Sequence, residues 1–288
     1  MTMRLPLLFL AAVLLTLTAC NDERTGLTSG TGIDVLAQVR ANKTVRVGVL
    51  ANNPPFSYQI GKNWTGFDIE IAQGVANSLG IEKVVFVQLT LSQRGDAVVN
   101  GLVDMVVASM TITRFREANP EKPKSSVDFS IPYFQDGQAL LVKSASPIKS
   151  YLDLNGKKVG TIKGSTASFY MTQINPDAVV LKYPDNAALA KALDTGEIDA
   201  ATNDYLVLAG IAASATDPAS LRIAGDRMTA EPYGIAVAPN QSAWRNAINH
   251  ALIGLWENQD WHASAVTWFG PASKFSSPVN FVMHAYPK

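Results

Sequence analysis

The sequence predicts an α/β chain of two lobes, each built on a mainly parallel β-sheet with helices on both faces. Two runs of alternating strand and helix patterns, at residues 45–108 and 158–202, lead to this prediction. The second run repeats the architecture of the first without a visible repeat of its sequence. Because ligands of such sheets bind at the carboxyl ends of the strands, a cleft between the lobes is the expected site.

The first run starts with a strand, since Val45, Val47 and Val49 alternate with other residues. The elements expected after it are a helix from about Asp68 to Gly80, a strand over Val84–Leu89, a helix over Ser92–Asn100 and a strand over Val103–Ala108.

The second run is expected to form a strand over Lys158–Ile162, a helix from about Ala167, a strand over Val179–Leu181, a helix over Ala187–Leu193 and a strand over Ile198–Thr202. Pro132–Gly137 joins the two runs and Tyr233–Val237 returns after the second, so these segments are the expected hinge crossings. Lobe 1 is therefore predicted to comprise residues 43–137 and 230–270, lobe 2 residues 138–229, and a tail residues 271–288.

The N-terminus has the features of a signal peptide over residues 1–19, because Arg4 precedes an apolar run that is too short to cross a membrane. Leu17-Thr18-Ala19-Cys20 resembles the lipobox of bacterial lipoproteins, which implies cleavage before Cys20 and acylation of its thiol. Residues 20–42 are predicted to be a flexible linker between this lipid and the folded domain.

Composition limits the remaining functions. Removal of residues 1–19 leaves 23 basic and 24 acidic side chains, a net charge of −1, and nothing predicts binding to nucleic acid. Three histidines and one cysteine have no metal-ligand spacing, so no metal and no cofactor are expected.

Three motifs carry a resemblance to a known family: Gly66–Ala72, Met110–Arg116 and Val127–Tyr133. Their order is similar to that in the family 3 extracellular solute-binding proteins, over nearly the whole of residues 43–270. The resemblance implies the two-lobed type II periplasmic binding protein fold, with two hinge strands and an amino acid in the cleft. It also implies a monomer that is not an enzyme, located in the periplasm or at the cell surface, which closes around its ligand and delivers it to the permease of an ABC importer.

The resemblance assigns site residues in lobe 1. Arg116 would bind the ligand carboxylate with its planar fork, Thr111 would add a hydroxyl and a backbone N–H, and the Ser109 carbonyl would face the ammonium. Phe56 resembles the aromatic residue that packs on the ligand, although a lone phenylalanine is also typical of a core. For Thr113 a helix cap is the preferred interpretation.

In lobe 2, Ser165 and Thr166 lie between a strand and a helix, where free backbone N–H groups favour an anion. Thr166 matches a carboxylate contact of the family, while capping of the helix is the alternative role, and both roles are compatible. Asp204 stands where the family places the partner of the ligand ammonium, whereas Asp199 is expected to be structural.

The prediction of an acidic ligand depends mainly on Arg94. It lies in the first turn of a predicted helix, where a cation opposes the helix dipole unless an anion binds there. Ser92–Gly95 also resembles the aspartate/glutamate-binding branch, in which this arginine meets the side-chain carboxylate of the ligand. The alternatives are an arginine that faces solvent or one that pairs with Asp96 or another acid of its own lobe.

The favoured function is thus capture of glutamate or aspartate for transport. The alternatives are binding of glutamine or another polar amino acid, a ligand-sensing partner of a receptor ectodomain, and a periplasmic dehydratase of the same fold. Two features depart from the family pattern: Glu117–Ser126 reads as a loop insertion, and Ser109 stands where many members have glycine.

Overall fold

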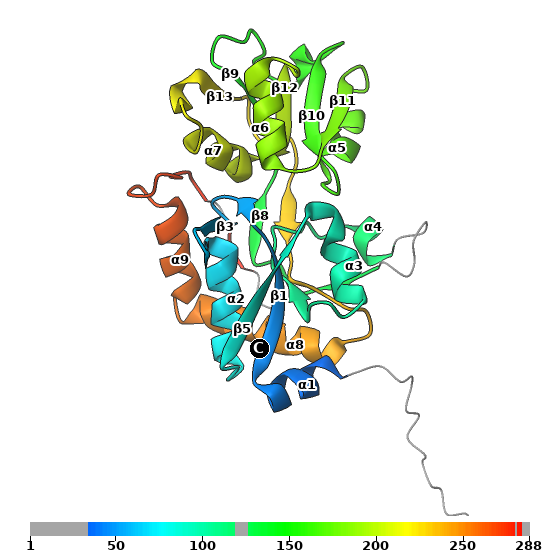
Figure 1. The fold of residues 1–288 in the computed structure, drawn as a ribbon, viewed down its shortest axis with the longest axis vertical. Helices are drawn as coiled ribbons and strands as arrows, with labels where there is room; N and C mark the ends of the chain where they lie inside the picture. Colours follow the sequence, from blue (N-terminus) through cyan, green and yellow to red (C-terminus); the bar gives the residue numbers. More distant parts are fainter. Residues whose placement is uncertain (1–33, 119–125, 280, 284–288) are drawn as a thin grey trace, which may run out of the picture. The chain divides into compact units, whose positions relative to one another are not determined.

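A computed structural model describes residues 34–118, 126–279 and 281–283 of the protein. The signal peptide, Cys20 and most of the predicted linker lie outside these residues, as does most of the predicted insertion. Residues 34–288 belong to one unit, which contains two sheet-based lobes (Figure 1). None of the helices in the described ranges has the length and apolar character needed to cross a membrane.

Lobe 1 is built on a five-stranded sheet in which the two best-formed strands pair in parallel. In spatial order its strands are β5 (Lys83–Leu89), β1 (Thr44–Leu50), β6 (Met105–Val106), β15 (Ala236–Val237) and β7 (Asp128–Phe129). Strand β1 is parallel to both of its neighbours, and β15 is antiparallel to both of its own.

Helices cover both faces of this sheet, as the alternation of side chains along β1 requires. Val45, Val47 and Val49 pack in one core cluster with α2 (Phe67–Ser78) and α8 (Ser242–Glu257). Leu50 packs on the other face with α3 (Arg94–Val99). The other elements of lobe 1 are α1 (Val35–Asn42), η1 (Leu91–Gln93), α4 (Arg114–Glu117), α9 (Asp260–Phe269) and a small sheet of β2 (Asn52–Asn53), β3 (Ser57–Ile60) and β4 (Asn63–Thr65).

Lobe 2 has a second five-stranded sheet. Its strands in spatial order are β11 (Val179–Tyr183), β10 (Lys158–Ile162), β12 (Ala200–Asp204), β9 (Gln138–Lys143) and β13 (Leu221–Ala224). Its helical elements are η3 (Tyr151–Asp153), α5 (Ala167–Ile174), α6 (Asn186–Thr195), α7 (Tyr205–Ala213) and η4 (Pro218–Ser220). The α/β class and its strand–helix alternation are thus confirmed in both lobes.

Two antiparallel strands connect the lobes, β8 (Phe134–Asp136) and β14 (Glu231–Tyr233), and they form a two-stranded sheet of their own (Figure 1). The first predicted crossing contains β8. The second was placed slightly too late, because Ala236–Val237 belongs to the sheet of lobe 1. Pro232 hides the true strand in the sequence, although an edge strand tolerates proline.

The prediction of a flexible linker over residues 20–42 is wrong for its last part. Val35–Asn42 form α1, whose N-cap Asp34 accepts a hydrogen bond from the Ala37 amide. Val39 is fully buried in the core of lobe 1 and α1 packs against α8. The predicted helix over Ser92–Asn100 also begins differently, as the single 3₁₀ turn η1 that leads into α3.

Candidate functional site

A polar cavity lies between the lobes, and seven of the eight predicted site residues line it: Arg94, Ser109, Thr111, Arg116, Ser165, Thr166 and Asp204. The lining residues that sequence reasoning did not identify are Leu50, Asn53, Leu91, Asn203 and Val207. The free space is about 20 Å³, little more than one water molecule needs. An amino acid therefore enters only when the lobes or the lining side chains move.

Phe56 does not line the cavity, so its predicted role as a ligand contact is wrong. Its side chain is fully buried, and its ring packs at 5.3 Å from the Phe134 ring and 5.4 Å from the Tyr233 ring. The alternative interpretation, a core phenylalanine, is correct. The sequence motif around Phe56 places it next to the site but does not reveal which way the ring points.

Arg116 lies on α4 and reaches the cavity from lobe 1. Its Nη1 donates to the Thr111 carbonyl (2.6 Å) and its Nη2 to the Gly164 carbonyl (3.1 Å). Among the described residues, these two bonds leave three of the five guanidinium N–H groups without an acceptor. Burial lowers the pKa of Arg116, while the carboxylates of Glu231 and Asp204 act in the opposite direction.

Arg94 is 2% exposed, which excludes the solvent-facing alternative. Its four hydrogen bonds go to backbone carbonyls, those of Leu91 (3.0 Å), Ala108 (2.8 Å), Ser109 (3.2 Å) and Gly164 (3.2 Å). Among the described residues no ion pair joins it to Asp96 or to any other acid. Burial and the nearby charge of Arg116 lower the pKa of its guanidinium to about 9.

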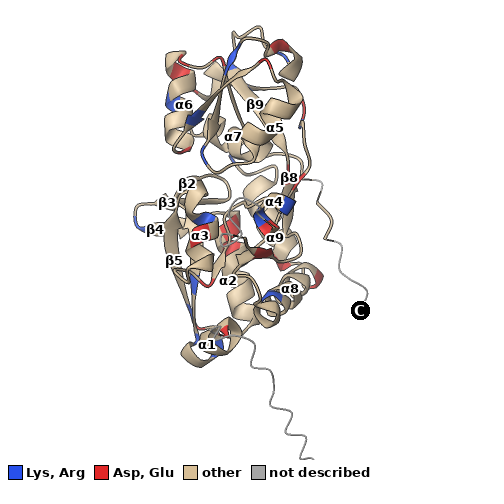
Figure 2. Ribbon diagram, turned by 90° about the vertical axis from the view of Figure 1, so that its right-hand side faces the viewer, with Lys and Arg blue, Asp and Glu red and all other residues tan. Residues whose placement is uncertain are grey.

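The two arginines come from lobe 1 (Figure 2, blue segments at α3 and α4) and share one acceptor in lobe 2, the Gly164 carbonyl. Gly164 has φ +83°, and a Cβ atom added there would lie 2.6 Å from the backbone N and Cα of Ser92. The loop after β10 thus approaches η1 more closely than any side chain permits. This loop is one of the contacts at which the two walls of the cleft meet.

Ser109 adopts the left-handed conformation, with φ +46°, which glycine adopts with less strain. Its hydroxyl accepts from Asn53 Nδ2 (3.1 Å) and donates to Asp68 Oδ2 (3.0 Å). These two bonds hold the serine side chain in place while its backbone keeps this left-handed conformation. Its carbonyl already accepts from Arg94 and keeps a second lone pair for a ligand donor.

A chain of amide side chains continues from Ser109 across the lobes. Asn186 Nδ2 donates to Asn53 Oδ1 (3.0 Å), and Asn203 Nδ2 donates to Asn186 Oδ1 (3.1 Å). Asn203 Oδ1 accepts from the Asp204 amide (2.9 Å). The chain links Ser109 to Asp204, the two groups predicted to meet a ligand ammonium.

Thr111 and Thr166 donate their hydroxyls to a residue that sequence reasoning missed, Glu231 on β14. The two distances to Glu231 Oε2 are 2.8 Å from Thr111 and 2.6 Å from Thr166. Glu231 is fully buried behind the cavity wall. No signal in the sequence indicates it, because the predicted second crossing begins two residues later, at Tyr233.

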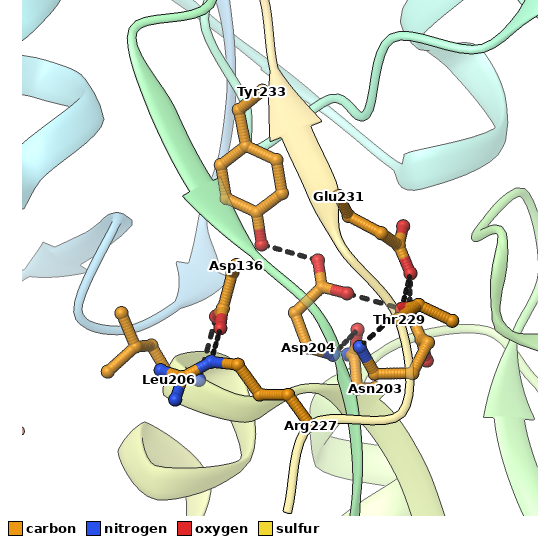
Figure 3. Close-up of polar contacts among 9 residues, drawn as sticks. Asp136, Asn203, Asp204, Leu206, Arg227, Thr229, Glu231 and Tyr233 are labelled. Atoms are coloured by element: carbon orange, nitrogen blue, oxygen red, sulfur yellow. Dashed lines mark hydrogen bonds and ion pairs between the residues drawn. The ribbon is translucent and has the colours of Figure 1, made fainter. Parts of the chain in front are cut away.

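Asp204 ends β12 and accepts hydrogen bonds from Gln138 Nε2 (2.7 Å) and from the Tyr233 hydroxyl (Figure 3). Burial raises its pKa well above the ordinary value, and the carboxylates of Glu231 and Asp136 add to this rise. The nearby Asp136 pairs with Arg227 at 2.8 Å. Its pKa is raised to about 6, mainly by burial.

Of the residues interpreted as helix caps, Thr113 forms a cap and Thr166 does not. Thr113 caps α4, since its hydroxyl accepts from the Arg116 amide (3.2 Å). Thr166 precedes α5 without a side-chain cap bond, and the Ser165 hydroxyl donates to the Ile162 carbonyl (2.7 Å). The two lobe 2 residues therefore leave the first N–H groups of α5 free of side-chain caps.

The fold and the cleft define a two-lobed solute-binding protein. The model of the bacterial extracellular solute-binding proteins, family 3, matches residues 45–271, and the chain belongs to this family. The resemblance seen in the three sequence motifs is thereby confirmed at the level of the family.

Relatives and solved structures agree with this assignment. The ABC transporter glutamine-binding protein GlnH of Bacillus subtilis is 39% identical over 76% of this chain and 78% of its own. The glutamate-binding protein GluB of Corynebacterium efficiens is 30% identical over 84% of this chain and 82% of its own. A structure titled an ancestral arginine-binding protein bound to glutamine has 35% identity and a TM-score of 0.72, and it covers 79% of this chain and 98% of its own.

Proposed function

We propose that the protein captures a polar amino acid outside the cytoplasmic membrane and delivers it to the permease of an ABC importer. The observation that carries the proposal is the division of charge across the cavity. Arg116 in lobe 1 keeps N–H groups for a carboxylate, and Asp204 at the end of β12 offers a carboxylate to an ammonium.

This division favours hinge closure as the mechanism. Each lobe carries half of the partners of a zwitterion, so a bound amino acid connects the lobes and stabilises the closed conformation. The strands β8 and β14 are the connections about which the lobes would move. The role proposed is binding, and the ligand is expected to leave the site chemically unchanged.

Glutamine is the ligand that we favour, and Arg94 provides the reason. If each of its four carbonyl bonds uses a separate hydrogen, one N–H remains. A single N–H suits the amide oxygen of glutamine, whereas a side-chain carboxylate is best bound by two parallel N–H groups. The relatives named as glutamine-binding support the same choice.

Glutamate, with aspartate, is the second candidate. Arg94 lines the cavity as the acidic hypothesis requires, and two of the relatives are named as glutamate-binding. Rotation of the guanidinium away from the Gly164 carbonyl would free a second N–H for a carboxylate.

Isothermal titration of the protein with L-glutamine, L-glutamate and L-aspartate tests both candidates. We expect L-glutamine to bind at least tenfold more tightly than L-glutamate. Tighter binding of L-glutamate would restore the acidic ligand, and binding of none would contradict the proposal. Mass spectrometry after incubation should recover the bound amino acid intact, because a dehydratase would release an altered product.

We also propose that residues 1–19 are removed and that Cys20 carries a lipid, which would hold the protein at the membrane as a monomer in the periplasm or at the cell surface. Metabolic labelling with a fatty acid, followed by detergent phase partition, tests the anchor. The Cys20→Ser variant should lose both the label and the partition into detergent.

A further inference from the structure

Glu231 occupies an unusual position, at the junction of both lobes and both crossing strands. It lies on β14 opposite Asp136 of β8. Its Oε2 accepts the hydroxyl of Thr111, which belongs to lobe 1, and that of Thr166, which belongs to lobe 2. One carboxylate oxygen therefore bridges the two walls of the cleft.

The other oxygen of Glu231 is held by neighbours outside the cavity wall. Oε1 accepts from Gln138 Nε2 (2.7 Å) and from the Thr229 hydroxyl (3.0 Å), as Figure 3 shows for Thr229. All four partners donate hydrogens, so the group is satisfied as a carboxylate.

A threonine hydroxyl has one hydrogen to donate. While Thr111 and Thr166 donate to Glu231, neither can donate to the carboxylate of an amino acid in the cavity. The Glu231 carboxylate and the ligand carboxylate therefore compete for the same two hydroxyl hydrogens.

We propose that Glu231 is an affinity-determining residue of this site: its carboxylate holds the two hydroxyl donors that the α-carboxylate of an amino acid requires, and the ligand binds by taking these donors from it. This inference rests on the proposed amino-acid ligand. Glu231 then weakens binding and sets how readily the ligand leaves, since it returns to the donors on release.

The exchange removes both donors from Glu231 Oε2, and this loss is the cost by which Glu231 weakens ligand binding. Glu231 keeps Gln138 and Thr229 at Oε1 when the hydroxyls turn away. Arg116, with N–H groups to spare, meets the incoming carboxylate beside the same hydroxyls.

The Glu231→Gln variant tests the exchange with little change of shape. Gln138 and Thr229 are donors, so they orient the amide with its oxygen on their side and its NH₂ toward Thr111 and Thr166. The NH₂ group then donates to both hydroxyl oxygens and leaves their hydrogens for the ligand. Titration with L-glutamine should give a Kd about tenfold lower than that of the wild type.

Glu197→Gln is the matched control, because it makes the same chemical change at an exposed glutamate whose hydrogen bond is with Tyr183. Its Kd should equal that of the wild type. Thr229→Val is a second variant outside the cavity lining. It removes one of the donors that Glu231 keeps during the exchange, so it should raise the Kd by about threefold.

The outcomes separate this inference from the proposed function. A Kd equal to that of the wild type in both Glu231→Gln and Thr229→Val would overturn the exchange alone. Weaker binding by Glu231→Gln would make Glu231 a supporting contact instead of a competitor. If neither the wild type nor the variants bind any amino acid, the proposed function fails and the inference falls with it.

Discussion

The two walls of the cleft hold their charges in different ways. Arg94 and Arg116, on the lobe 1 wall, donate to backbone carbonyls, and neither forms an ion pair among the described residues. Asp204, on the lobe 2 wall, and Glu231, on the crossing strand β14, accept from hydroxyl and amide side chains. Among the described residues the two arginines thus form no direct ion pair with these two acids.

This difference indicates that a ligand must supply a carboxylate for the arginines and an ammonium for Asp204. A direct ion pair between the walls would close the cleft without a ligand, whereas separate hydrogen bonding keeps each charge available. The two arginines are held by backbone carbonyls, whose positions are fixed by the fold. Asp204 and Glu231 are held by side-chain donors, which can rotate. The following predictions test the two walls, from the largest expected effect to the smallest.

Arg116→Ala should weaken the binding of every amino-acid ligand by about a hundredfold or more. Loss of the guanidinium leaves the buried ligand carboxylate without its cation, which typically costs about 2–5 kcal/mol. Titration with L-glutamine measures the effect. Arg114→Ala, at an exposed arginine of the same helix, is the control and should bind like the wild type.

Asp204→Asn should weaken binding by roughly thirtyfold, about 2 kcal/mol, because the ammonium loses its charged partner. Wild-type affinity should also rise with pH. Asp204 has a raised pKa in the free protein, and a bound ammonium favours its ionised form, so binding releases a proton. The affinity therefore increases between the ordinary pKa and the raised one.

Titration in buffers of different ionisation enthalpy detects this proton release. Asp199→Asn serves as the control, since its carboxylate accepts from the Lys158 amide at an exposed site. An unchanged proton release in Asp204→Asn would assign the titration to another group.

Asp68, beneath the lobe 1 wall, should make stability depend on pH. It accepts from the Tyr133 hydroxyl (2.7 Å) and from Ser109, and burial raises its pKa to about 6. The folded protein then holds a proton that the unfolded chain gives up near pH 4. The free energy of unfolding should fall by about 2 kcal/mol as the pH rises from 4 to 6.

Urea denaturation across this pH range measures the slope. Asp68→Asn should reduce it, and part should remain because Asp136 also has a pKa of about 6. Asp177→Asn, at an exposed position, should leave the slope unchanged. A stability that rises over this range in the wild type would contradict the assignment.

Gly164→Ala should have the smallest effect, about a tenfold loss of affinity through faster dissociation. The added methyl group meets the Ser92 backbone and keeps the two walls apart. Gly156→Ala controls for backbone strain, because Gly156 has φ +67° with no atom within 4 Å of an added Cβ. Equal affinities of the two variants would show that this contact does not limit closure.

Local patterns predict the lobes well but not every part of the site. β10 was predicted with its observed ends, because both faces of a central strand are buried and Gly156 precedes it. The residues of the cleft were predicted from the family motifs, because a motif assigns a role to a given position in the chain. The direction of Phe56 depends on Phe134 and Tyr233, distant residues that no local pattern reveals. Glu231 was missed for a similar reason, since all but one of its partners lie far away in sequence.

Helix α1 determines how a pull on the N-terminal segment would reach the molecule. The chain enters the described fold at Asp34, and α1 packs on α8 within lobe 1. A force applied upstream of Asp34 would therefore be borne by lobe 1, and the strands β8 and β14 would lie off the load path. Lobe 2 would then move without bearing this force, and the force would neither open nor close the cleft.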